Sequence, residues 1–135
     1  MNYLFIDDDK LQLMKLKKAL DPFSQIHEIK IMDNPLTAME LVRTRTFSPD
    51  VIVVDFNMPQ MDGLDFIKEL KFSGHSYIPI VISTTMNCVE MAKECYGNGA
   101  AGYLIKPTDY KEFTKKLKIL IQYWEANLFP ETSNC

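Results

Sequence analysis

The sequence lacks the features that mark several large classes of protein. No apolar stretch approaches the ~20 residues that a membrane-spanning helix needs. The first residues, Met1-Asn2-Tyr3, show neither the charged start nor the apolar stretch of a signal peptide. No basic run is longer than Lys115-Lys116 and the net charge is −3, whereas a nucleic-acid-binding surface is usually clearly basic. We therefore expect no membrane segment and no direct contact with nucleic acid.

Cysteine is scarce and shows no metal-binding pattern. The three cysteines, Cys88, Cys95 and Cys135, are odd in number and lack the paired spacing of zinc ligands. Cys88 and Cys95 fall in an expected helix at a spacing that predicts that both lie on one face of it. Because structural disulfides are rare in the cytosol, we expect reduced thiols and a cytoplasmic protein.

What the sequence does contain is a regular alternation of apolar runs and helical patterns over 135 residues, a length typical of one domain. With 47% apolar residues, such a chain can bury about two-thirds of its unfolded surface. The expected strands are Tyr3–Ile6, Glu28–Met32, Val51–Phe56, Ile78–Thr84 and Gly102–Ile105. Three are continuously apolar, as in parallel strands covered on both faces, whereas Ile29 and Ile31 alternate with polar neighbours as on an edge strand.

Five helices are expected after these strands. Pro22 stops the first helix, Asn34 caps the second and Gly74 ends the third. Asp109 and Glu112 have the spacing of a capping box at the start of the fifth. The apolar positions that mark the helices are Leu13, Leu16 and Leu20; Leu36, Met39 and Val42; Phe66, Ile67 and Leu70; Ala92, Cys95 and Tyr96; and Tyr110, Phe113, Leu117, Leu120 or Ile121, and Trp124. The last stripe is expected to pack against the core.

Strand–helix units in series imply right-handed crossovers and an α/β fold with a doubly wound parallel sheet. We expect one domain over residues 1–128 and a flexible tail over residues 129–135. In sheets of this kind, ligands bind beyond the carboxyl ends of the strands. The residues that follow each strand are therefore the candidates for function.

Three consecutive carboxylates, Asp7-Asp8-Asp9, follow the first strand. At ~4 Å and an effective dielectric constant of ~20, each pair of like charges repels by about 4 kcal/mol before solvent relaxes it. One interpretation is that Asp9 caps the next helix and the other two are simply solvated. The second is that Asp7 and Asp8 share a divalent cation, because carboxylates at a strand end suit Mg²⁺.

A fourth carboxylate, Asp55, ends the very apolar third strand. Together with the acids of the first strand it makes an acidic pocket, in which Asp55 is either a further metal ligand or a nucleophile. Asp62 lies in a turn before the third helix, where a structural role is expected.

A hydroxyl and an ammonium group complete the set. Thr84 ends the fourth strand, where its hydroxyl can bond a phosphoryl oxygen or the residue can simply favour β-structure. Lys106 follows the fifth strand, and its bond to Pro107 is a candidate for the cis form. Acids, hydroxyl and lysine at one edge of the sheet are what phosphoryl transfer needs.

These residues resemble the receiver domain of two-component response regulators. The matching elements are Ile6-Asp7-Asp8, Val54-Asp55-Phe56-Asn57-Met58-Pro59, Met61-Asp62-Gly63, Thr84, Gly99-Ala100 and Gly102-Tyr103-Leu104-Ile105-Lys106-Pro107. The similarity runs from Tyr3 to about Trp124. It implies a flavodoxin-like fold, with a five-stranded parallel sheet in the order 2-1-3-4-5 and five helices.

The resemblance also implies roles for the site residues. Asp55 is the implied phospho-acceptor, and Asp7 and Asp8 the acid pair. Asp8 and Asp55 are implied to bind Mg²⁺ directly, with the backbone carbonyl of Asn57 as a further ligand. The expected protein is a signalling phospho-acceptor rather than an enzyme, with self-phosphorylation and self-dephosphorylation as its only chemistry.

The implied switch consists of Thr84 and Tyr103, with Lys106 pairing with the phosphate. Receiver domains accept phosphate from a histidine kinase or a phosphotransfer protein and then change shape on the face of the fourth helix, fifth strand and fifth helix. Because the chain ends soon after the fifth helix, we expect a stand-alone domain that acts by binding an unknown downstream protein. Trp124 and Phe129 are candidates for a homodimer or partner surface, or for covering the domain's own core.

Three alternatives stay open at this point. A haloacid-dehalogenase-type phosphohydrolase would use Asp7 as nucleophile and Asp9 as general acid, but it needs a further acidic pair, and only Asp109 and Glu112 follow closely. A receiver-like binding module would take no phosphate. A nucleotide-binding flavodoxin-like protein needs a Gly-rich phosphate loop after the first strand, which the sequence lacks.

The two histidines show no sign of carrying phosphate. His27 and His75 stand apart from the strand-end motifs, and we expect both at the surface.

Overall fold

The computed structural model describes residues 1–130 and shows one parallel sheet of five strands. The strands are β1 Asn2–Ile6, β2 Glu28–Met32, β3 Val51–Asp55, β4 Ile80–Thr84 and β5 Gly102–Ile105. Their order in the sheet is β2-β1-β3-β4-β5, which confirms the predicted order and the edge position of the alternating second strand. Three boundaries differ from the prediction: β1 begins one residue earlier, at Asn2, Ile78 and Pro79 precede β4, and Phe56 follows β3.

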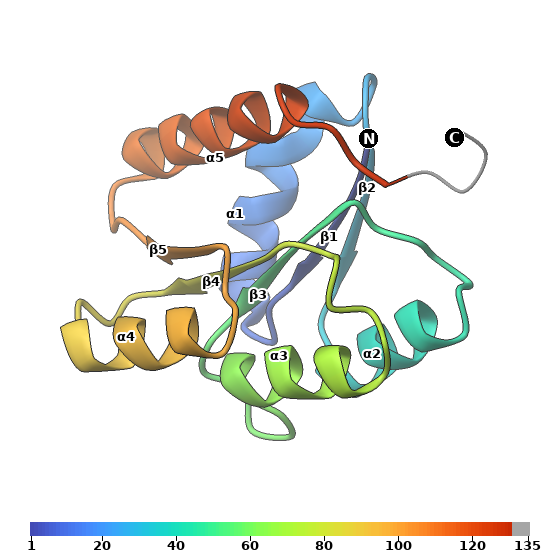
Figure 1. Ribbon diagram of the computed structural model, residues 1–135. Helices are drawn as coiled ribbons and strands as arrows, with labels where there is room; N and C mark the ends of the chain where they lie inside the picture. The colour runs from blue at the N-terminus through green and yellow to red at the C-terminus, as the bar shows by residue number, and fades with distance from the viewer. Residues whose placement is uncertain (131–135) are drawn as a thin grey trace.

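Helices cover both faces of the sheet (Figure 1). The helices are α1 Lys10–Leu20, η1 Asp21–Phe23, α2 Pro35–Arg43, α3 Gly63–Phe72, α4 Val89–Gly97 and α5 Tyr110–Glu125. Helices α1 and α5 pack on one face, and α2, α3 and α4 lie on the other. Pro22 does end α1, and the chain turns there through the short 3₁₀ helix η1.

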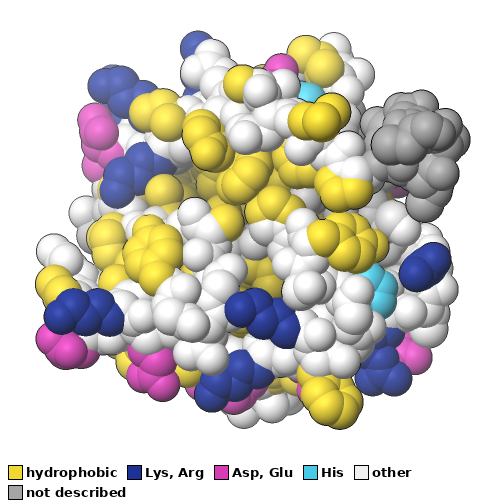
Figure 2. Space-filling model, viewed as in Figure 1, with side chains coloured by type: hydrophobic (Ala, Val, Ile, Leu, Met, Phe, Trp, Pro, Cys, Tyr) yellow, Lys and Arg dark blue, Asp and Glu magenta, His cyan; other side chains and the backbone are white. Residues whose placement is uncertain are grey.

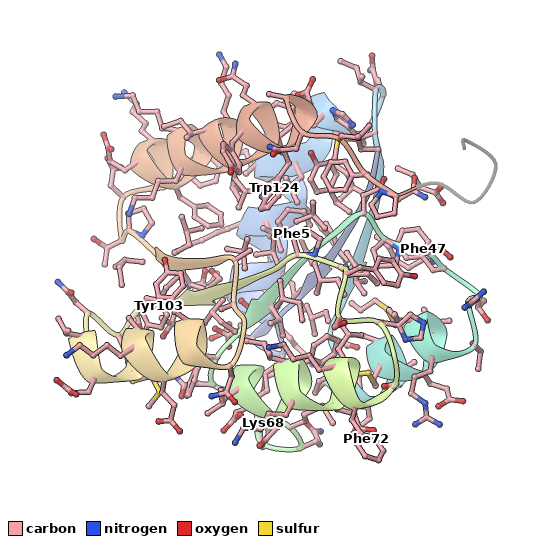
Figure 3. All side chains as sticks on the ribbon, viewed as in Figure 1. Phe5, Phe47, Lys68, Phe72, Tyr103 and Trp124 are labelled. Carbon is pink, nitrogen blue, oxygen red and sulfur yellow. The ribbon has the colours of Figure 1, made fainter. Side chains whose placement is uncertain are left out.

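The core has two layers because side chains of a strand alternate between the two faces of the sheet. Within β1, Tyr3 and Phe5 pack in the cluster under α1 and α5, whereas Leu4 and Ile6 pack in the cluster above α2 and α3. Figure 3 shows Phe5 and Trp124 in the layer between the sheet and α5. All five residues of β3 and of β4 are buried, as predicted for strands covered on both faces.

The end of the described chain packs back on the domain. Trp124 and Phe129 are partly buried against the cluster under α1 and α5, with their ring centroids 6.0 Å apart. Of the two roles considered for these aromatic residues, they therefore cover the domain's own core. The remainder of the expected tail, residues 131–135, lies outside the described residues.

Helix caps lie where the sequence predicts them. Asp9 accepts hydrogen bonds from the backbone N–H groups of Leu11 and Gln12, and Asn34 caps α2 in the same way. Asp62 and Asp109 cap α3 and α5. Each such cap is worth about 1 kcal/mol. Asp9 and Asp62 are therefore accounted for by structural roles.

Three expectations about single residues are wrong. His27 and His75 are both 7% exposed rather than at the surface. His27 is held by the amino terminus, 3.3 Å from its Nδ1, and by Glu125, 3.5 Å from its Nε2. Cys88 is the exposed cap residue of α4 whereas Cys95 is fully buried, so the two thiols do not share a helix face.

The peptide bonds and the helices of the described residues give two further findings. Over residues 1–130 no peptide bond is cis, so the Lys106–Pro107 bond is trans and the cis alternative is wrong. None of the helices in this part of the chain has the length and apolar character to span a membrane.

Gly63 is the one glycine whose missing side chain positions the functional edge of the sheet. A Cβ atom at this first residue of α3 would lie 3.1 Å from the Cα of Phe56 and 3.2 Å from the backbone oxygen of Asp55. These are backbone atoms of the last residue of β3 and of the residue that follows it, so they cannot move aside cheaply. We expect Gly63→Ala to lower the free energy of unfolding by about 1–2 kcal/mol, measured by urea denaturation.

The matched control is Gly97→Ala, because a Cβ atom at the end of α4 meets nothing within 4 Å. That variant should be as stable as the parent protein or slightly more so, since alanine favours a helix. Equal stability of the two variants would show that the close approach at Gly63 is unimportant.

Candidate functional site

The predicted site residues follow three neighbouring strands. Asp7 comes directly after β1, Asp55 is the last residue of β3, and Lys106 comes directly after β5. The pairing of Ile6 with Val54 sets Asp7 beside Asp55 at one edge of the sheet. Helices α3, α4 and α5 all begin on the left in Figure 1, the side to which β4 and β5 point. The site therefore forms where sequence analysis placed it, beyond the carboxyl ends of the strands.

Lys106 bridges the two buried carboxylates. Its Nζ donates to Asp7 Oδ2 and to Asp55 Oδ1, each at 2.8 Å. The side chains of all three are 11% exposed or less, so water screens these bonds little. Sequence analysis placed this lysine at the same edge of the sheet as the acids. The structure shows that one ammonium holds both acids.

The acidic residues are arranged to hold a cation. Asp7, Asp8 and Asp55 each offer one carboxylate oxygen, and these oxygens lie within 4.8 Å of one another. Asp7 and Asp55 are buried, and Asp8 is half-buried. Carboxylate oxygens in such a setting suit a divalent ion that keeps several of its waters. The donor set therefore fits the Mg²⁺ that the sequence implied. Asn57 lies in the exposed loop two residues after Asp55.

Burial dominates the acid–base properties of the site. Burial raises the pKa of Asp55 from its ordinary 3.8 to about 6; the bond to Lys106 opposes this shift, and the charges of Asp7 and Asp8 add to it. Burial alone would lower the pKa of Lys106, but its bonds to Asp55 and Asp7 outweigh that effect and raise it. At neutral pH the site therefore holds an ionised Asp55 and a charged lysine.

Thr84 and Tyr103 are connected through the backbone of Met86. Thr84 is fully buried, and its Oγ1 accepts a hydrogen bond of 3.1 Å from the Met86 N–H. The Tyr103 hydroxyl donates to the Met86 carbonyl at 3.0 Å, and burial raises the pKa of this tyrosine. The switch pair predicted from the sequence is thus joined by the first turn of the loop after β4.

Comparison with known proteins identifies the family. The family model described as the response regulator receiver domain matches residues 3–118. The chain belongs to this family. The receiver domain is a signalling domain, and its match supports the phospho-acceptor interpretation of the strand-end residues. Neither the hydrolase nor the phosphate-free binding module is favoured by these comparisons.

Several curated relatives contain a similar receiver domain. The chain is 31% identical over 132 residues to the transcriptional regulatory protein ZraR of Klebsiella oxytoca, covering 98% of this chain and 29% of that protein. It is 33% identical over 128 residues to the DNA-binding transcriptional regulator NtrC of Klebsiella pneumoniae, covering 95% of this chain and 26% of that protein. The chain therefore spans less than a third of the length of these relatives.

Solved structures agree with the receiver fold. A chemotaxis protein of Vibrio cholerae, CheY4, is 27% identical, with a TM-score of 0.72 and coverage of 87% of this chain and 96% of that one. The Mn(2+)-bound form of response regulator Rcp1 is 24% identical with a TM-score of 0.85, covering 96% of this chain and 99% of that one. At that identity, the second likeness concerns the fold alone.

One connection in this receiver domain was not predictable from residue types. Met86 joins Thr84 to Tyr103 through its backbone N–H and carbonyl groups, which every residue except proline possesses. No side-chain signal marks such a position. The double bridge by Lys106 was foreseeable only in part, because the sequence does not show which of several acids a lysine will contact.

Proposed function

We propose that this receiver domain is a phospho-acceptor of a two-component phosphorelay and that Asp55 receives the phosphoryl group. The observation that carries the proposal is the convergence of Asp55, Lys106 and the acid pair of Asp7 and Asp8 in one buried site. The donor is a phosphohistidine of a sensor histidine kinase or a histidine phosphotransfer protein. A Mg²⁺ ion would be held by Asp7, Asp8, Asp55 and the backbone carbonyl of Asn57.

The residues present can perform the transfer. One carboxylate oxygen of Asp55 forms a bond to phosphorus while the bond from phosphorus to the donor's imidazole nitrogen breaks. That nitrogen keeps the electron pair. Lys106, already 2.8 Å from Asp55, neutralises the charge that spreads over the phosphoryl oxygens. A bound Mg²⁺ supplies further positive charge to the same oxygens. Loss of the phosphate to water would be self-dephosphorylation, the only other chemistry expected.

The switch in this proposal begins at Thr84. Its Oγ1 accepts from Met86, so the hydroxyl hydrogen remains available to donate to a phosphoryl oxygen. A phosphate brings about −1.5 to −2 units of charge and strong acceptor oxygens, so this donation would draw Thr84 toward Asp55. The loop at Met86 would move with it and release the Tyr103 hydroxyl. Phosphate then favours one of two states of the face formed by α4, β5 and α5.

The proposed output is that the receiver domain, residues 1–128, binds a downstream protein through that face. It would do so without itself contacting nucleic acid or a membrane. Formation of a homodimer through the same face is included in the proposal. We place the protein in the cytoplasm, because its relatives named as DNA-binding regulators act where DNA is.

Mapping the phosphorylated residue tests the proposal. The protein is incubated with acetyl phosphate and Mg²⁺, and the acyl phosphate is located by mass spectrometry after peptic digestion at low pH. Label on Asp55 supports the phospho-acceptor function. Label on Asp7 would instead point to a hydrolase-type nucleophile, and absence of any adduct would favour a phosphate-free binding module.

Lys106→Ala should reduce signalling more than phosphorylation. The ammonium that now bridges Asp7 and Asp55 would pair with the phosphoryl group, so its loss removes the contact that ties the phosphate to β5. We expect phosphorylation within about tenfold of the parent but no gain in partner binding on phosphorylation. The measurement is a pull-down with and without beryllofluoride.

Lys68→Ala is the matched control, because Lys68 is exposed and points away from the sheet on α3 (Figure 3). That variant should respond to beryllofluoride as the parent does. A normal partner response in Lys106→Ala would refute the signalling role of this lysine.

A further inference from the structure

Positive charge is concentrated on the two helices that cover one face of the sheet. Helix α1 contains four lysines and no acidic residue, and α5 contains four lysines and two glutamates. Together they carry a net charge of +6 in a chain whose total is −3, which leaves −9 for the rest. Figure 2 shows lysine side chains over the left end of α5, where this helix begins. The protein is therefore strongly polarised, although its composition is mildly acidic.

A groove lies between these helices on their outer side. It has a volume of about 490 Å³, and its floor and walls include Pro22, Phe23 and Tyr110. Lys18, Lys115 and Lys118 stand around it. Lys18 Nζ lies 5.4 Å from the centre of the Tyr110 ring. The groove thus combines an apolar, partly aromatic interior with a cationic border. It is separate from the site of Asp55.

The charges of the lysines at the border are not neutralised by strong ion pairs. Within residues 1–130, Lys18 and Lys118 form no ion pair with a carboxylate, and Lys115 forms only a long, exposed contact of 3.9 Å with Glu112. Exposed pairs of that kind contribute little. Lys116 differs from them, because it donates to the backbone carbonyl of Ile105. Unpaired ammonium groups beside an apolar hollow attract an acidic partner and select it over a neutral or basic one.

We propose that the groove between α1 and α5 is a docking site for an acidic protein segment that carries an apolar side chain between its carboxylates. The apolar side chain would enter the hollow beside Phe23 and Tyr110, and the carboxylates would pair with Lys18, Lys115 and Lys118. This interaction goes beyond the phospho-acceptor function, because none of these residues contacts the site of Asp55. It provides a binding surface that is available with or without phosphate.

Two other occupants fit less well. Nucleic acid is usually bound with arginine as well as lysine along an extended strip, and neither α1 nor α5 contains an arginine. A second copy of this chain would offer its acidic remainder to this face, but such a contact is head-to-tail and gives rings or open filaments rather than the symmetric dimer that is most common. An acidic segment satisfies both the charge and the apolar hollow.

Fluorescence anisotropy with defined probes tests the proposal on the full chain. The probe is a fluorescein-labelled peptide of repeated Glu-Glu-Leu-Glu units, compared with a polyglutamate peptide and a single-stranded DNA oligonucleotide of equal charge. Sedimentation with phosphatidylserine vesicles completes the set. We expect the leucine-containing peptide to bind most tightly, with an affinity that falls as salt rises, because exposed charges more than ~10 Å apart are screened at 0.1 M.

Paired charge reversals separate a local site from general attraction. Lys18→Glu combined with Lys118→Glu should weaken peptide binding by about tenfold or more, since attraction becomes repulsion at the groove. Lys68→Glu combined with Lys93→Glu changes the net charge equally on the exposed surface of α3 and α4 and should change binding by less than about twofold. Circular dichroism confirms that each variant is folded.

The possible results distinguish a local docking site from the alternatives. Equal losses in the two double variants, no peptide binding, or tighter binding of DNA or vesicles than of the peptide would overturn the proposal. Asp55→Asn should bind the peptide as the parent does, so failure of Asp55 to accept phosphate leaves this inference intact. Loss of peptide binding in Asp55→Asn would count against a phosphate-independent groove.

Discussion

We expect Asp55→Asn to abolish uptake of phosphate from acetyl phosphate or a phosphohistidine donor while the fold stays intact. The amide has the shape of the carboxylate but cannot supply the anionic oxygen that attacks phosphorus. It still fills the buried end of β3, and Lys106 retains its bond to Asp7. Phosphate incorporation, measured with radiolabelled donor, should fall below detection, whereas the far-ultraviolet circular dichroism spectrum should not change.

A matched substitution of the same chemical kind is available in Asp62→Asn. Asp62 caps α3 and lies outside the lysine-bridged cluster. Since asparagine is also a good cap, that variant should fold and accept phosphate like the parent. Hydroxylamine-labile phosphate that persists on Asp55→Asn would show that another residue is the acceptor.

The same Asp55→Asn variant should be more stable than the parent at neutral pH in the absence of divalent cations. The pKa of Asp55 is raised to about 6 in the folded state from an ordinary 3.8, so between these values the folded state holds its proton more tightly than the unfolded state. Stability therefore falls as pH rises through this window. With the Asp55 side chain only 11% exposed, the full loss is about 3 kcal/mol.

Urea unfolding at pH 4.5 and pH 7.5 in EDTA measures this effect. The amide that replaces the carboxyl group does not titrate, so the stability of Asp55→Asn relative to the parent should grow by about 2–3 kcal/mol between these pH values. Lys106 adds no slope here, because its folded pKa is raised above 10.5 and its contribution is lost only above that value. A constant difference between the proteins would mean that Asp55 is not destabilised by burial.

Adding Mg²⁺ at pH 7.5 should reverse the order. The ion binds ionised carboxylates in the folded state, so at a concentration 100 times its dissociation constant it stabilises the parent by about 2.7 kcal/mol. Asp55→Asn lacks one of the three carboxylates that converge there and should gain less.

The fold was predictable because local and long-range signals agree. The apolar runs of β1, β3 and β4 are buried on both faces, and the alternation of Ile29 and Ile31 correctly indicated an edge. Caps such as Asp9 and Asn34 have a side-chain chemistry that identifies the start of a helix. The predicted start of β4 was two residues too early, because Ile78 extends the apolar run. Ile78 precedes Pro79 and lies outside the pairing of β4 with β3.

The histidines show where such reasoning fails. His27 and His75 are polar by type, yet both are buried, and the contact of His27 with Glu125 joins residues that are 98 positions apart in the sequence. Periodicity carries no information about contacts of this kind. The site was predicted better, because parallel strands deliver Asp7, Asp55 and Lys106 to one edge whatever the details of packing.

The link between Thr84 and Tyr103 through the main chain of Met86 has a consequence for how this domain tolerates mutation. Both bonds use peptide atoms, so replacing the thioether side chain leaves them in place. Alanine at position 86 would remove only the packing of the thioether against the core, and the two hydrogen bonds would remain. Only proline, which has no N–H to offer to Thr84, would cut the connection there.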